Sequence, residues 1–181
     1  LCVGQDVWDY TGIDIVGDLA ALPFGDNSFG AVICSQVLEH VPEPQAVLTQ
    51  LQRVLRPGGL LFITVPQQWY VHQPPHDYYR YTKFGLDYLL KKTGFRVNTM
   101  QPIGGYFLLL SHRIALFPRF FFPPPRSKAL KILRKPFKEL TELFFMRALP
   151  HLFKLLDKYD TARFATAGYN VVAVKESPHP E

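Results

Sequence analysis

The stretch that decides the fold runs from residue 13 to residue 66 and reads IDIVGDLAALPFGDNSFGAVICSQVLEHVPEPQAVLTQLQRVLRPGGLLFITVP. Apolar runs separated by turn residues predict strand, loop, strand, helix and strand in that order. Residues 30–34 and 60–65 carry no charge, which is typical of strands covered on both faces of a parallel sheet. Pro42-Glu43-Pro44 opens the helix between them and Pro57-Gly58-Gly59 ends it. The unit is therefore βαβ, with a right-handed crossover.

Four blocks within this stretch carry a family resemblance: GDLAALPF (17–24), NSF (27–29), QVLEHV (36–41) and LRPGG (55–59). In this order they resemble the central half of a class I S-adenosylmethionine-dependent methyltransferase, and the resemblance covers residues 13–101 and 168–175. It implies an α/β, Rossmann-like fold with strand order 3-2-1-4-5-7-6, truncated here at its N-terminal side. We expect a methyltransferase core at 1–105, a helical insertion at 106–165, and the final core strand and tail at 166–181.

The family places a first strand, a glycine-rich loop, a helix and a second strand before the segment that Ile13–Val16 resembles. Residues 1–12 show no such pattern. We therefore expect Ile13–Val16 to be a third strand without its neighbours. We also expect the cofactor pocket to lack its glycine loop and the acidic residue that holds the ribose hydroxyls.

The remaining half of that pocket follows from the rule that open α/β sheets bind ligands at the carboxyl ends of their strands. By resemblance, the Asp18 carboxylate accepts from the adenine amino group and the Leu19 amide reaches a ring nitrogen. The alternative for Asp18 is a cap on the following turn. Cys34, Ser35 and Gln36 end the next strand on the same edge, where they can face the methionine part of S-adenosylmethionine.

Residues 67–82 form the richest polar stretch, QQWYVHQPPHDYYRYT, directly after a strand. Loops in this position are commonly substrate-facing. His76 is the first candidate for a base that takes a proton from an acceptor hydroxyl, followed by Asp77 and His40. We expect Tyr78, Tyr79 and Arg80 to bind the acceptor. The alternative is a loop whose tyrosines pack on the next helix while Asp77 and Arg80 pair.

Residues 106–160 hold eleven Lys and Arg against four Asp and Glu, so this segment carries +7 and the rest of the chain −2. Such a local excess favours an anionic partner over nucleic acid. Residues 127–158 alternate apolar and basic positions at helical spacing, with breaks near Pro136 and Pro150. The pattern suits either an amphipathic helix on an anionic membrane surface or a lid over the acceptor site. No run reaches the length of a transmembrane helix.

The two cysteines lie in different elements, which does not suggest a disulfide framework, and no ligand spacing indicates a metal. We therefore expect a cytoplasmic protein, which is peripheral on a membrane if the basic segment contacts lipid. Two functions from different classes follow. The first is methyl transfer from S-adenosylmethionine to a small-molecule, glycan or lipid-linked acceptor. The second is a catalytically incomplete binding or membrane-docking module. A nicotinamide-dependent oxidoreductase is disfavoured because the chain lacks a glycine fingerprint and a correctly placed Tyr-x-x-x-Lys pair.

Overall fold

The structure is a computed structural model, and it describes residues 3–6, 11–12, 14–118 and 127–176, except for the side chains of residues 6 and 128–132. Two compact units divide the chain. Unit 1 comprises residues 1–101 and 168–181, and unit 2 comprises residues 102–167. Each unit is described below by itself.

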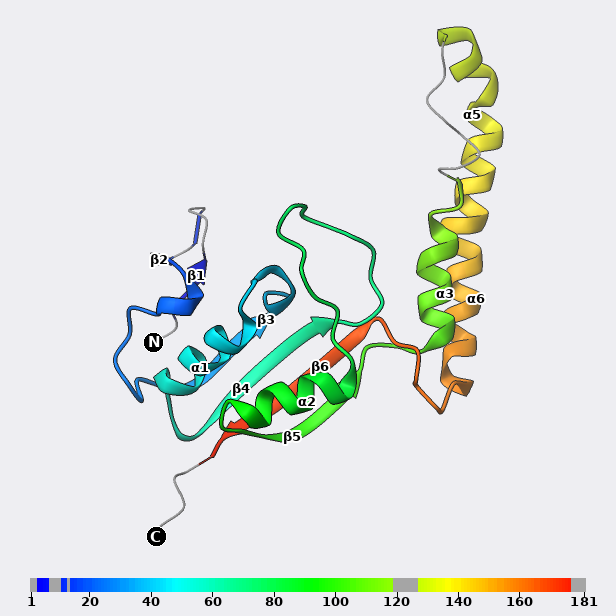
Figure 1. Cartoon of the computed structure of the whole chain (residues 1–181). Helices are drawn as coiled ribbons and strands as arrows, with labels where there is room; N and C mark the ends of the chain where they lie inside the picture. The colour runs from blue at the N-terminus through cyan, green and yellow to red at the C-terminus, as the bar shows by residue number, and fades with distance from the viewer. Residues whose placement is uncertain (1–2, 7–10, 13, 119–126, 177–181) are drawn as a thin grey trace. The chain divides into compact units, whose positions relative to one another are not determined.

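A four-stranded sheet is the centre of unit 1 (Figure 1). Its strands are β3 (Phe29–Ser35), β4 (Leu55–Pro66), β6 (Gly168–Lys175) and β5 (Phe95–Pro102), neighbours in that order. β3 and β4 run parallel, whereas β6 is antiparallel to β4. This order reproduces the 4-5-7-6 half of the predicted sheet, so the predicted α/β, Rossmann-like fold class is confirmed.

Two helices of unit 1 begin and end at the residues that local chemistry favours. α1 (Pro44–Val54) has proline in its first turn, and α2 (Lys83–Lys92) is capped by Thr82, whose hydroxyl accepts from the Gly85 amide. α1 buries one apolar stripe in the core, formed by Val47, Leu48, Leu51 and Val54. α1 ends three residues before Pro57, where the sequence predicted its end, because Leu55 is already extended and pairs with Phe29 of β3.

A small second sheet corrects the prediction for the start of the chain. β1 (Gln5–Asp6) pairs in parallel with β2 (Ile15–Val16), and the Asp14 side chain accepts from the Gly4 amide at 2.7 Å. The expectation that this third strand stands without a neighbour is therefore wrong. The predicted strand Ile13–Val16 is reduced to its last two residues, and Ile13 lies outside the described residues. Two residues per strand are too short to give a periodicity, so the sequence pattern did not indicate β1.

Unit 2 is helical. α3 (Tyr106–Ala115) packs beside α6 (Leu149–Leu156), and α5 (Lys128–Leu143) leads through a π-helical turn (Phe144–Ala148) into α6. The predicted break near Pro136 is wrong, because α5 continues through it. Pro150 lies in the first turn of α6, where its missing N–H costs nothing. No helix of the described part is both long and apolar enough to cross a bilayer.

The amino end of α3 is held by two carboxylates from the turn that follows α6. Asp157 accepts from the amides of Gly105 and Leu108 at 3.1 and 2.9 Å, and Asp160 accepts from the Tyr106 amide at 2.7 Å. These bonds satisfy amides that a helix leaves without partners. Asp157 is buried, which raises its pKa, but Arg163 and the α3 amides outweigh the burial and hold the pKa below its ordinary value.

Candidate functional site

Polar side chains meet where β3 and β4 end. The Ser35 and Thr64 hydroxyls lie 2.7 Å apart, and the Gln36 side-chain amide donates to Thr64 Oγ1 at 3.1 Å. The main-chain N–H of Gln36 also donates to the Thr64 carbonyl, and the chain turns at Gln36, whose φ is +52°. Ser35 and Gln36 therefore stand exposed at the carboxyl edge of the sheet, where ligands bind in open α/β folds.

Asp18 follows β2 and caps the short 3₁₀ turn Leu19–Ala21, with Oδ1 accepting from the Ala20 amide at 2.8 Å. Arg53 of α1 holds the chain directly after this turn. The Arg53 guanidinium donates to the carbonyls of Leu22 and Phe24 at 3.0 and 2.8 Å and to Asp26 at 2.8 Å. The capping alternative for Asp18 is thus present, and it uses one of the two carboxylate oxygens, Oδ1.

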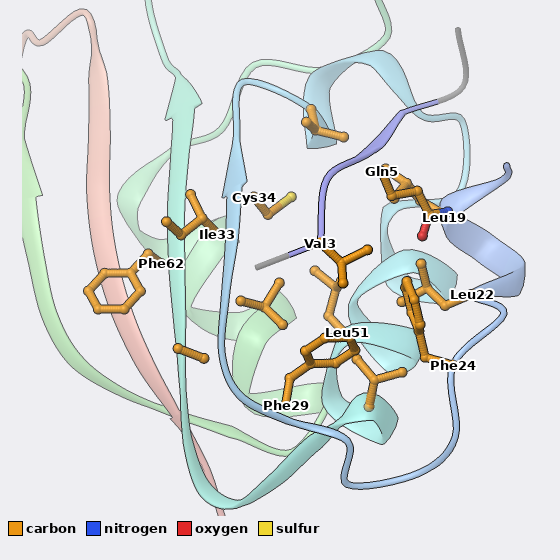
Figure 2. A pocket seen from close by; sticks show the side chains of 14 residues that line it. Val3, Gln5, Leu19, Leu22, Phe24, Phe29, Ile33, Cys34, Leu51 and Phe62 are labelled. Atoms are coloured by element: carbon orange, nitrogen blue, oxygen red, sulfur yellow. The ribbon is translucent and has the colours of Figure 1, made fainter. Parts of the chain in front are cut away.

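Leu19 and Cys34, the other two predicted cofactor residues, line a hollow of about 350 Å³ in unit 1 (Figure 2). Its walls are almost entirely apolar and include Val3, Phe24, Phe29 and Leu51. Burial, reinforced by nearby Glu39, raises the pKa of the Cys34 thiol to about 12. Cys34 is therefore a neutral, apolar wall residue and not a nucleophile. The structure separates the predicted cofactor set into a polar edge and an apolar hollow.

The predicted acceptor-side loop, residues 67–82, is tied to the segment that follows β3. Both the Tyr78 and the Tyr79 amide donate to the Glu39 carbonyl, at 2.8 and 3.2 Å. His40 Nδ1 donates to the His76 carbonyl at 2.5 Å, which requires the proton on Nδ1 because a carbonyl only accepts. The buried Tyr81 hydroxyl donates to the Leu38 carbonyl at 2.7 Å. The structure therefore brings His40 and the predicted acceptor residues together.

Within this loop Asp77 and Arg80 form a two-pronged ion pair, with N–O distances of 2.6 and 2.8 Å. Arg80 also donates to the carbonyls of Trp69 and Tyr70, and Asp77 accepts from the His72 amide at 2.8 Å. The hydrogen bonds from Arg80 and from this amide hold the Asp77 pKa well below its usual range. The predicted alternative pairing is present. A carboxylate engaged in this way is a weak base.

The His76 side chain is less constrained. Its Nδ1 lies 3.2 Å from the Tyr78 hydroxyl, and Tyr78 is 45% exposed. Tyr79, also partly exposed, donates its hydroxyl to the Pro42 carbonyl at 2.8 Å. His76 and Tyr78 thus offer a nitrogen and a hydroxyl on an accessible part of the loop, whereas Tyr79 and Arg80 are engaged in holding it.

Two residues outside the predicted set of site residues, Glu39 and His72, adjoin His40. Glu39 is fully buried, burial raises its pKa, and His40 Nε2 lies 3.9 Å from Oε1. The His72 ring meets the His40 ring edge-on at 4.7 Å. The signal that could have found Glu39 is its place inside an otherwise apolar run, Val37-Leu38-Glu39, at a helix entry. Nothing in the sequence brings His72 to it.

Comparison with known proteins finds that the chain is similar to methyltransferases over part of its length. Residues 5–63 match the family model described as "Methyltransferase domain". A demethylmenaquinone methyltransferase of Renibacterium salmoninarum is 51% identical over 49 residues, which are 27% of this chain and 21% of that protein. A ubiquinone biosynthesis O-methyltransferase of Dechloromonas aromatica is 33% identical over 88 residues, 49% of this chain and 34% of that protein. The chain therefore spans about a fifth to a third of the length of these relatives.

Among solved structures, the chain is similar to the 1,6-didemethyltoxoflavin-N1-methyltransferase of Burkholderia thailandensis, with a TM-score of 0.54 and 15% identity over 96% of this chain and 60% of that one. Identity at this level speaks for the fold alone. The sheet order and the structural likeness give the chain the fold of class I methyltransferases, and residues 5–63 are similar in sequence to a methyltransferase domain. The four sequence blocks that resemble S-adenosylmethionine-dependent methyltransferases, residues 17–59, all lie within the matched segment.

Proposed function

We propose that the chain is part of an enzyme that transfers the methyl group of S-adenosylmethionine to a hydroxyl of a small-molecule or lipid-linked acceptor. The observation that carries the proposal is the polar edge made by Ser35, Gln36 and Thr64 at the ends of two parallel strands, with Asp18 at the end of a third. This edge lies within, or one residue beyond, the segment that matches the methyltransferase family.

Each edge residue has a role that its chemistry suits. The Asp18 carboxylate accepts from the adenine amino group through the oxygen that does not cap the turn, and the Leu19 amide reaches a ring nitrogen. Ser35 and Gln36 face the methionine part of the cofactor.

The methyl group of a sulfonium is already activated, so the protein must mainly bring the acceptor oxygen in line with it, at about 3–3.5 Å from the methyl carbon. His76 takes the proton of the acceptor hydroxyl, with Tyr78 beside it. Asp77 acts indirectly: its pairing with Arg80 fixes the loop that carries His76. A base in such a position contributes about 10²- to 10⁴-fold.

Calorimetric titration of S-adenosylmethionine, and of its demethylated product, tests the cofactor half of the proposal. We expect micromolar binding that Asp18→Ala weakens about 10- to 100-fold, the value of one hydrogen bond to a charged acceptor. Asp18→Ser is the matched variant, because serine also caps helices well but removes the carboxylate. If Asp18→Ser binds like the wild type, Asp18 only caps the turn. If the folded wild type releases no heat, the binding or membrane-docking module becomes the better interpretation.

A specific observation in unit 2 favours contact with an anionic membrane surface. Leu133, Phe137, Leu140 and Phe144 recur at helical spacing and are 78, 66, 64 and 51% exposed, and the exposed cations Arg134, Lys135 and Lys138 alternate with them. An apolar stripe bordered by cations is typical of interfacial helices. This surface would bring the enzyme to a lipid-linked acceptor.

Flotation with vesicles of phosphatidylserine and phosphatidylcholine tests this part. We expect binding to the anionic vesicles, less binding at high salt, and loss of binding in Leu133→Ser/Leu140→Ser. Phe84→Ser is the control, because Phe84 is equally exposed but lies on α2 of unit 1. Equal flotation of all three proteins, or none, would exclude a role for the stripe.

A further inference from the structure

We propose that Glu39, His40 and His72 form a binding site for a divalent transition-metal ion of the Zn²⁺ type. The ligand atoms of these three side chains all lie within 4.8 Å of one another. Two of the residues follow β3, and the third comes from the loop after β4. The proposal reverses our sequence-based expectation of no metal, and it stands independently of the proposed methyl transfer.

The first observation is the Glu39 carboxylate. Glu39 has no solvent exposure, and both of its oxygens are buried without a hydrogen-bond partner among the described residues. Buried polar atoms are almost always hydrogen-bonded, and a buried carboxylate is costly unless it is paired or binds a metal. An ordinary core position would be filled better by glutamine or leucine. A cation between Glu39 and the two imidazoles accounts for its presence.

The second observation is the tautomer of His40. Because Nδ1 donates to the His76 carbonyl, the neutral ring has its lone pair on Nε2, and this atom lies 3.9 Å from Glu39 Oε1. Metal-binding histidines typically donate their other ring nitrogen to a carbonyl or carboxylate, which fixes the ring. His40 already has this arrangement.

His72 completes the set by its position. Its Nδ1 lies 3.3 Å from the Tyr70 carbonyl and 3.5 Å from Arg80 Nη2. The carbonyl bonds only a protonated Nδ1 and the guanidinium only an unprotonated one, so these contacts do not fix the tautomer, and a ring nitrogen of His72 lies within the cluster. The charge of Arg80 is balanced by its two-pronged pairing with Asp77, so the neighbourhood is not positive overall.

The ligand chemistry selects the kind of ion. Two imidazoles and one carboxylate suit Zn²⁺, Co²⁺ or Fe²⁺, whereas Mg²⁺ prefers oxygen ligands and water. With bonds of about 2.0–2.2 Å, tetrahedral ligands lie about 3.3 Å apart, so small side-chain rotations bring the three groups into place. The ion would join the segment after β3 to the acceptor-side loop and leave one coordination position open.

Metal binding is measured directly, on chelator-stripped protein, by competition of Zn²⁺ with a chromophoric chelator and by the absorption spectrum of bound Co²⁺. We expect one ion per chain, a higher melting temperature with Zn²⁺ and no effect of Mg²⁺. Glu39→Gln and His72→Gln should each weaken binding at least ~100-fold and abolish the thermal shift. His72→Gln keeps the proposal testable if the Glu39 variant does not fold.

His76→Gln is the matched control: it removes a histidine of the same loop that is not part of the cluster, and binding should persist. The proposal is overturned if the wild type binds no stoichiometric Zn²⁺ at micromolar concentration. It is also overturned if Glu39→Gln and His72→Gln bind as well as the wild type, or if His76→Gln loses binding as they do.

Discussion

Arg53 holds the loop that carries Asp18 and Leu19, and its replacement by methionine has a predictable cost. Arg53 donates to the carbonyls of Leu22 and Phe24 and to the Asp26 carboxylate, outside its own helix. A bond from a charged donor contributes about 1.5–3 kcal/mol, and partial exposure favours the lower end, so the two carbonyl bonds contribute about 3 kcal/mol. Asp26 is 70% exposed and adds less than about 1 kcal/mol.

Urea unfolding followed by tryptophan fluorescence measures this cost, because both tryptophans lie within residues 1–101. Methionine retains most of the apolar stem, so the loss reports the guanidinium. We predict that Arg53→Met lowers the free energy of unfolding by about 3 kcal/mol and weakens S-adenosylmethionine binding, because the Asp18 turn loses its support. For a chain of this size the melting temperature falls by about 6–12 °C.

Arg56→Met is the control on the same helix–loop junction. Arg56 reaches the same loop through longer bonds, 3.3 Å to the Asn27 carbonyl and 3.5 Å to the Ser28 carbonyl, and it is exposed. We expect less than about 1 kcal/mol from this change. Equal effects of the two substitutions, or a loss below about 1 kcal/mol in Arg53→Met, would refute the reasoning that these carbonyl bonds hold the loop.

Three further predictions concern single residues. In a Cys2→Ser background, Cys34 should resist a thiol-reactive dye at about pH 8 until urea unfolds the protein, because burial raises the pKa of its thiol to about 12. Rapid labelling of Cys34 in the folded chain would contradict this. Gly168→Ala should destabilise unit 1 by about 1–3 kcal/mol in urea unfolding, because a Cβ there overlaps a main-chain carbonyl of β4; an unchanged midpoint would disprove the overlap. Asp157→Asn should lower the melting temperature near pH 7, and the difference from wild type should shrink as the pH falls below about 4. The reason is that the carboxylate paired with Arg163 has a lowered pKa and loses its contribution to stability when it is protonated; a difference that does not change with pH would argue against ionic capping of α3.

Much of unit 1 could be predicted from the sequence because its elements have strong local signals. β3 and residues 60–65 of β4 are nearly continuous apolar runs, Pro44 and Thr82 mark helix starts, and the family resemblance supplied the sheet order. β1 was not predicted because two residues are too few to show a hydrophobic periodicity. Pro136 was misjudged because a proline predicts a kink or break only when the helix cannot accommodate it, and here neighbouring turns continue past it.

The site was less predictable because its contacts cross the sequence. The resemblance indicated Asp18, Ser35 and Gln36, but no pattern reveals that Thr64 joins them or that Cys34 faces an apolar hollow. The roles of the predicted site residues stay predictions. His72 could not be found by spacing, because it contacts His40 only when the loop 67–82 folds back and its amides bind the Glu39 carbonyl.

The same carbonyl has a consequence for how the two halves of the site communicate. Its bonds to the Tyr78 and Tyr79 amides, together with the bond from His40 to the His76 carbonyl, fasten the loop to the short segment that leaves β3 beside Gln36. The loop cannot swing away as a hinged flap without breaking all three bonds and pulling on that segment. A shift of either side therefore strains the other, so the sheet edge at Gln36 and the loop 67–82 are coupled through the Glu39 carbonyl, the His40 imidazole and the hydroxyls of Tyr79 and Tyr81.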